Sequence, residues 1–141
     1  MACHAHSSTF TNNLLDAVSF GDHEAVNFIL SKTNHNFDQH LDGKGNNVLH
    51  YCASREAEGL AAVLISQYNA SSIINKVNKN KESALHLHCK FGCKVGVACL
   101  LYHGAIADIT SRDGVTPLDL ATQLVDQDIA NMLRSYGAKK S

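Results

Sequence analysis

The sequence contains no tryptophan, a single proline and few charged residues. Only 18% of its 141 residues are charged, below the roughly 25% of an ordinary soluble domain, and 12 basic residues nearly balance 13 acidic ones. Proteins that bind nucleic acids need clustered positive charge, so we expect no nucleic-acid partner. The scarcity of proline, together with 45% hydrophobic residues, argues against a disordered chain.

Long apolar runs are also missing. The longest one, residues 95–101, is far shorter than the roughly 20 residues that span a bilayer, so we expect no membrane insertion. Residues 1–8 show neither the basic region nor the apolar core of a secretory signal. We therefore expect a cytoplasmic protein, with the nucleus as a further compartment. Reduced thiols are then expected for all five cysteines, which are Cys3, Cys52, Cys89, Cys93 and Cys99.

The sequence does contain a pattern that recurs about every 35 residues. Four leucines mark it, at spacings of 35, 36 and 33 residues: Leu14, Leu49, Leu85 and Leu118. Apolar residues follow each leucine at a distance of twelve residues: Val26, Ala61, Val97 and Ala130. They follow again at a distance of fifteen residues: Ile29, Leu64, Leu100 and Leu133. Agreement at several offsets at once indicates four repeated units.

Two short helices are predicted in each unit. In the third unit, Leu85 and Cys89 share one face of a first helix. Val97 and Leu100 form the apolar stripe of a second helix, and Gly104 follows where a left-handed C-cap belongs. Turn-rich segments separate the units, at residues 42–46, 78–82 and 111–115. Because one helix pair cannot bury its stripe alone, the units must stack.

The first helices carry a recognisable motif. The fourth unit reads Asp-Gly-Val-Thr-Pro-Leu-Asp-Leu-Ala over residues 113–121, which resembles the Gly-x-Thr-Pro-Leu-His-x-Ala signature of the ankyrin repeat family. The second and third units keep the histidine of this signature as His50 and His86, whereas the first has Leu15 there. The resemblance covers about residues 8–138. It implies an all-α solenoid of stacked helix-turn-helix units with β-hairpin-like loops.

The resemblance also implies a division of the chain. The expected repeats lie at about 8–41, 42–77, 78–110 and 111–138, between a flexible N-terminus (1–7) and a C-terminal tail (139–141). The second and third units depart from the family pattern by short insertions near residues 34–40 and 69–75.

One stretch looks like a set of metal ligands, namely His86, His88, Cys89 and Cys93. Zinc takes thiolate and imidazole ligands, normally four in a structural site. His86, however, matches the signature histidine, which in the family bonds the backbone of the turn, and Cys89 stands at a small core position. The two remaining residues do not make a structural zinc site, so we expect no metal.

Catalytic motifs are absent from the sequence. It has no Gly-x-Ser-x-Gly elbow, no glycine-rich phosphate loop and no Cys-x-x-Cys pair. We therefore expect no catalytic residues and no cofactor.

A binding surface is what the resemblance implies instead. Partners of the family usually dock on the loop tips and on the exposed side of the first helices, which together line a concave groove. Carried over position by position, the groove candidates are Ser19, Phe20, Ser54, Arg55, Lys90, Phe91, Gln123 and Leu124. The tip candidates are Lys44, Asn46, Lys79, Asn80, Glu82, Arg112, Asp113 and Val115.

Three groove candidates are large and apolar, namely Phe20, Phe91 and Leu124. Aromatic residues flanked by Lys or Arg are typical of interface hot spots. The alternative is that the two phenylalanines turn inward and pack against a neighbouring unit. Basic residues near this row form a strip that would suit an acidic partner, although solvated charge is the ordinary explanation for them: Lys44, Arg55, Lys79, Lys81, Lys90 and Arg112.

The leading hypothesis is a monomeric, non-catalytic module that presents this groove to a protein or peptide partner. A second hypothesis is the regulatory segment of a larger enzyme, because residues 45–53 are similar to repeats found beside Arf GTPase-activating domains. A third is a small inhibitor that resembles the ankyrin inhibitors of Rel-type transcription factors.

Overall fold

The computed structural model describes residues 10–32, 37, 41–53 and 59–138, and the side chains among them from Leu14 onward. Within these residues the chain forms α-helices and one 3₁₀ helix, with no strand. The α-helices are α1 (Phe10–Ser19), α2 (His23–Lys32), α3 (Val48–Tyr51), α4 (Leu60–Tyr68), α5 (Ala84–Lys90), α6 (Lys94–Tyr102), α7 (Pro117–Gln123) and α8 (Gln127–Ser135). The all-α prediction is confirmed.

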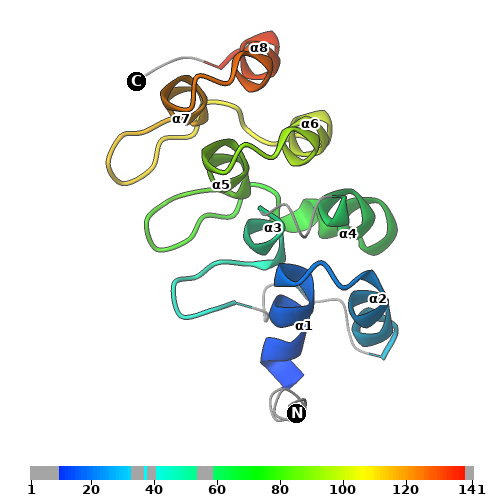
Figure 1. The fold of residues 1–141 in the computed structure, drawn as a ribbon. Helices are drawn as coiled ribbons and strands as arrows, with labels where there is room; N and C mark the ends of the chain where they lie inside the picture. The colour runs from blue at the N-terminus through cyan, green and yellow to red at the C-terminus, as the bar shows by residue number, and fades with distance from the viewer. Residues whose placement is uncertain (1–9, 33–36, 38–40, 54–58, 139–141) are drawn as a thin grey trace.

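The helices form two parallel rows. First helices pack side by side in the order α1, α3, α5, α7, and second helices α4, α6 and α8 form the row behind them. The phenol of Tyr68 in α4 donates a 3.0 Å hydrogen bond to Asn27 of α2, which extends this second row. In Figure 1 the loops before α3, α5 and α7 project on the side of the first helices that faces away from the second helices. Each of the four predicted repeat ranges holds one helix pair.

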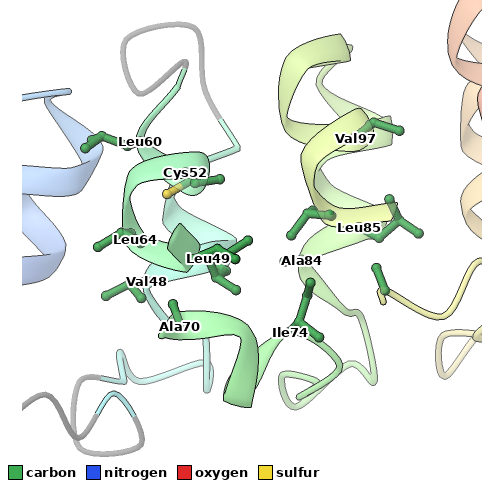
Figure 2. Packing of buried hydrophobic residues seen from close by; sticks show 14 of the residues in the cluster. Val48, Leu49, Cys52, Leu60, Leu64, Ala70, Ile74, Ala84, Leu85 and Val97 are labelled. Carbon is green, nitrogen blue, oxygen red and sulfur yellow. The ribbon is translucent and has the colours of Figure 1, made fainter. Parts of the chain in front are cut away.

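The core runs continuously through the stack. All four aligned leucines are buried in it: Leu14, Leu49, Leu85 and Leu118. Figure 2 shows Leu49 of α3 and Leu85 of α5 at equivalent places in the second and third units, with Leu64 and Val97 from the second helices of these units. Burial of these apolar faces stabilises neighbouring units together, since one helix pair alone could not remove its apolar stripe from water.

The predicted insertion at residues 69–75 has a structural role. It contains the 3₁₀ helix η3 (Ala70–Ile73), and Ala70, Ile73 and Ile74 are buried in the core. Of the other insertion, at residues 34–40, the structure describes only Phe37, which is also buried.

Three first helices begin with a reciprocal capping box. The N-cap side chain accepts from backbone amides of the first turn, and the third helical side chain accepts from the N-cap amide. The pairs are Asn47 with His50, Ser83 with His86, and Thr116 with Asp119. These caps fix where each first helix leaves its loop.

The two capping histidines also join neighbouring units. His50 Nε2 donates to the carbonyl of Glu82 at 2.9 Å, and His86 Nε2 donates to the carbonyl of Val115 at 3.0 Å. Each acceptor lies in the loop of the next unit. Burial lowers the pKa of both histidines below their ordinary value, so both rings are neutral near pH 7. The role implied for the signature histidine is thus present.

Candidate functional site

The turns that end α1, α5 and α7 share one hydrogen-bond pattern. The amides of Phe20, Phe91 and Leu124 each donate to the carbonyl four residues earlier, at 3.0–3.1 Å. The amide two residues further on closes a Schellman motif in each turn, at 2.9–3.0 Å. The three side chains therefore occupy equivalent places in successive units.

All three of these side chains are exposed. The exposed fractions are 77% for Phe20, 54% for Phe91 and 49% for Leu124. The alternative that the phenylalanines pack inward is therefore wrong. The ammonium group of Lys90 lies 5.8 Å from the centre of the Phe91 ring, within reach of a cation–π contact.

The other groove candidates differ in their surroundings. Gln123 is exposed, whereas Ser19 is half-buried and its hydroxyl donates to the carbonyl of Asp16 at 3.0 Å. Ser54 and Arg55 lie outside the described residues.

A second row of side chains on the same helix face escaped the sequence analysis. Leu87 and Leu120 lie four residues before Phe91 and Leu124, and residues four apart share one face of a helix. Both leucines are half-buried. Tyr51, the equivalent residue of α3, donates from its phenol to Asp42 Oδ2 at 2.9 Å. Burial and this hydrogen bond raise the pKa of Tyr51 to about 12. The repeat spacing could have identified this second row, since all three residues follow the aligned leucines by two positions.

The three loops before α3, α5 and α7 form equivalent tips. In each, the first residue's amide donates to the carbonyl of the fifth, at 2.9–3.1 Å. Neighbouring tips are also joined, because Lys79 N donates to Lys44 O at 3.0 Å and Arg112 N donates to Asn80 O at 2.8 Å. Five tip candidates are exposed: Lys44, Lys79, Asn80, Arg112 and Asp113.

The remaining tip candidates, Asn46, Glu82 and Val115, are half-buried and hold the loops in place. Asn46 Oδ1 accepts from Asn78 Nδ2 of the next tip at 2.8 Å. The carbonyls of Glu82 and Val115 accept from the capping histidines. These three residues hold the tips in position, and their side chains are less accessible to a partner than those of the exposed tip candidates.

The stretch that resembles metal ligands in the sequence is divided among structural roles. His86 caps α5, and His88 Nε2 donates to the carbonyl of Leu49 in the preceding unit at 3.1 Å. Burial raises the pKa of Cys89 to about 12, which leaves it an unreactive thiol. Within the described part of the chain, no three His, Cys, Asp or Glu side chains are arranged to hold a metal ion.

His88 has one feature that the sequence analysis missed. Its Nδ1 atom is buried and has no hydrogen-bond partner among the described residues, and burial lowers the pKa of the ring to about 4. The ring lies against Gly96 of α6, where even a methyl group would collide with it.

Two findings on the whole of the described chain and its family complete this description. No helix in the described ranges is long and apolar enough to cross a membrane. A family model of ankyrin repeats, in three copies, matches residues 63–141, more than half of the chain.

Proposed function

Since this chain belongs to the ankyrin repeat family, whose repeats are typically non-catalytic modules for protein–protein interaction, we propose that it binds a protein or peptide partner on the exposed side of its first helices and on its loop tips. We further propose that the units before residue 63 belong to the same binding surface. The packing of α1 against α3, and of α3 against α5, supports this extension.

The repeated exposure of one apolar position carries the proposal. Phe20, Phe91 and Leu124 stand in the same turn of three units and remain largely in contact with solvent. A partner that covered them would remove apolar surface from water at about 25 cal/mol per Å². Neighbouring tips are fixed to one another by backbone hydrogen bonds, so less ordering entropy is lost on binding.

The experiment compares a substitution after the first helix of the third unit with one at the end of its second helix. Phe91→Glu places a charge on the first-helix side, and Tyr102→Glu places the same charge at an exposed site at the end of α6. We expect Phe91→Glu to abolish capture of a specific partner from cell lysate, measured by quantitative mass spectrometry, and Tyr102→Glu to retain it. Circular dichroism checks that both variants keep their helices. Equal capture by both variants would contradict the proposed face.

A further inference from the structure

Val125 has an unusual backbone conformation for a branched residue. It follows α7 in the same turn that Gly21 and Gly92 occupy after α1 and α5. The φ angles of these two glycines are 69° and 71°, and that of Val125 is 57°. Left-handed φ is easy for glycine and strained for a β-branched side chain. In two other units of this chain, the equivalent position is therefore occupied by glycine, which adopts this conformation without strain.

Lys81 repeats this situation at a loop tip. It occupies the fourth position of its loop, where the other two tips have Gly45 and Gly114. Their φ angles are 80° and 79°, and that of Lys81 is 59°. In the described residues one further non-glycine residue has positive φ, Asn69, and asparagine tolerates this conformation.

Neither strained side chain is compensated by packing within the described chain. Val125 is 75% exposed, and Lys81 is exposed as well. A Cβ atom built at Gly92, the equivalent of Val125, meets no atom within 4 Å. At the two equivalents of Lys81, a Cβ atom meets nothing within 4 Å at Gly114 and lies 3.4 Å from the backbone nitrogen of Lys79 at Gly45. Strained backbone of this kind clusters at functional sites, so these two positions point to contact with another molecule.

An apolar strip surrounds Val125. We define it as Leu87 on α5 and Phe91 directly after α5, together with Leu120 on α7 and Leu124 and Val125 directly after α7. The two helices pack side by side, so the strip is continuous across the third and fourth units. Exposed apolar patches of this kind mark interaction surfaces.

Cations dominate the exposed charge of the neighbouring tips. The basic side chains of the tips, which we call the cationic tips, are all exposed: Lys44, Lys79, Lys81 and Arg112. The single exposed carboxylate in the three described tips belongs to Asp113. The carboxylates of Asp42 and Glu82 are half-buried and accept hydrogen bonds inside their own loops. A partner of complementary charge therefore carries acidic residues beside its apolar ones.

The spacing of the strip favours a helical partner. Packed helices lie 8–10 Å apart, so the two rows of the strip, in the third and fourth units, are about 10 Å apart along the stack. In an α-helix, residues seven positions apart lie about 10.5 Å apart on nearly the same face. In an extended strand, three residues cover about 10 Å but point to opposite faces.

We propose that the apolar strip and the cationic tips bind an amphipathic α-helix of a partner protein, with heptad-spaced aliphatic residues on the strip and carboxylates beside the tips. This inference rests on the proposed function and specifies the shape and charge of the partner. Lys90, beside Phe91, adds a further cation to the same surface.

The test uses a designed peptide of three heptads, about 21 residues, acetylated, amidated and labelled with fluorescein. Each heptad carries leucines on one face and glutamates along one side of it. We expect binding to the intact chain by fluorescence anisotropy, weakened by added salt because the tips are exposed. Two matched peptides replace every glutamate by lysine, or place one proline at the centre to break the helix. Equal binding of either matched peptide would overturn the proposal.

Two glycine variants separate binding from folding. Val125→Gly and Lys81→Gly remove the two strained side chains, and relief of strain offsets the extra freedom of glycine in the unfolded chain, so neither should lower the Tm. We expect Val125→Gly to weaken peptide binding roughly tenfold, and Lys81→Gly to weaken it several-fold, chiefly by slowing association. Asn69→Gly, the matched control away from the strip, should leave the affinity unchanged.

Unchanged affinity in both glycine variants would overturn the inference. The inference can fail while the proposed function survives. If capture of the lysate partner depends on Phe91 and the acidic peptide does not bind, the chain is an interaction module whose partner has another chemistry.

Discussion

At the scale of single residues, the third unit exchanges size between its two helices. Its first helix has His88 where the other units have small residues: Ala17, Cys52 and Ala121. Its second helix has Gly96 where the others have larger ones: Ala25, Leu60 and Ile129. The imidazole ring fills the space that a side chain at Gly96 would take. The two departures from the repeat pattern therefore compensate each other.

The first prediction concerns Gly96. Inside a helix, Gly→Ala normally stabilises a protein by about 1 kcal/mol. Here the added methyl group collides with the buried His88 ring, and overpacking costs about 1–3 kcal/mol. We expect Gly96→Ala to lower the free energy of unfolding in urea. Pairing it with His88→Ala should give a clearly non-additive result, and simple additivity would contradict the contact.

The second prediction concerns pH. Burial lowers the pKa of His88 from 6.5 to about 4, so below pH 6.5 the unfolded chain takes up a proton that the folded chain excludes. Stability therefore falls as the pH falls from about 6.5 towards 4, by roughly 2 kcal/mol at pH 5 from His88 alone. His50 and His86 contribute in the same direction.

His88→Gln keeps a donor for the carbonyl of Leu49 and removes the titration. The slope of the unfolding free energy against pH, measured by urea denaturation between pH 7 and 5, should be smaller in this variant than in the natural chain. An unchanged slope would show that His88 does not carry the effect.

At the scale of helices, short length makes the caps important. Helix α3 has four residues, so most of its backbone groups depend on partners outside the helix. Asn47 Oδ1 accepts from the amides of Leu49 and His50 at 2.9 and 3.1 Å. At the other end, His88 of the next unit donates to the carbonyl of Leu49. Neighbouring units thus complete a helix that would not persist alone.

The third prediction follows from this dependence. Asn47→Ala should destabilise the protein by about 1–2 kcal/mol, because the N-cap is buried and serves two amides. Asp126→Ala is the control at α8, where the cap bonds one amide, that of Ile129. We expect a smaller shift of the urea midpoint for Asp126→Ala. A larger shift for the control would argue against α3 depending on its cap.

The arrangement of the helices was largely predictable from the sequence, because the repeat spacing sets their order and their apolar faces. The repeat pattern placed Phe91 among the groove candidates but left open whether its ring packs inward, and the folded chain exposes it. The strained turn at Val125 did not, since a φ angle is a property of the folded backbone. Nor did the pairing of His88 with Gly96, because it depends on contact between residues on different helices.

At the scale of the whole molecule, stability is shared between neighbours. Within the row of first helices, α5 packs against α3 on one side and α7 on the other, while α7 packs against α5 alone among the described first helices. In such stacks each unit contributes its own stability and that of its interfaces. We expect the central units to be the most protected part of the chain.

The fourth prediction tests this sharing. Removing residues 111–141 uncovers α5 and takes away the carbonyl of Val115 that accepts from His86. We expect a lower urea midpoint, and an m-value reduced by roughly a fifth in proportion to the smaller buried surface. Removing residues 139–141 alone is the control and should change neither. An unchanged midpoint in the long truncation would mean that the units fold independently.

The hydrogen bond between Tyr51 and Asp42 has an optical consequence. With no tryptophan in the chain, ultraviolet emission comes from four tyrosines, and a phenol that donates to a carboxylate emits weakly. Tyr51 stands on the first-helix row, next to the surface that we assign to the partner. A molecule that docked there and disturbed this bond would brighten the protein, so the chain carries its own fluorescent reporter of occupancy.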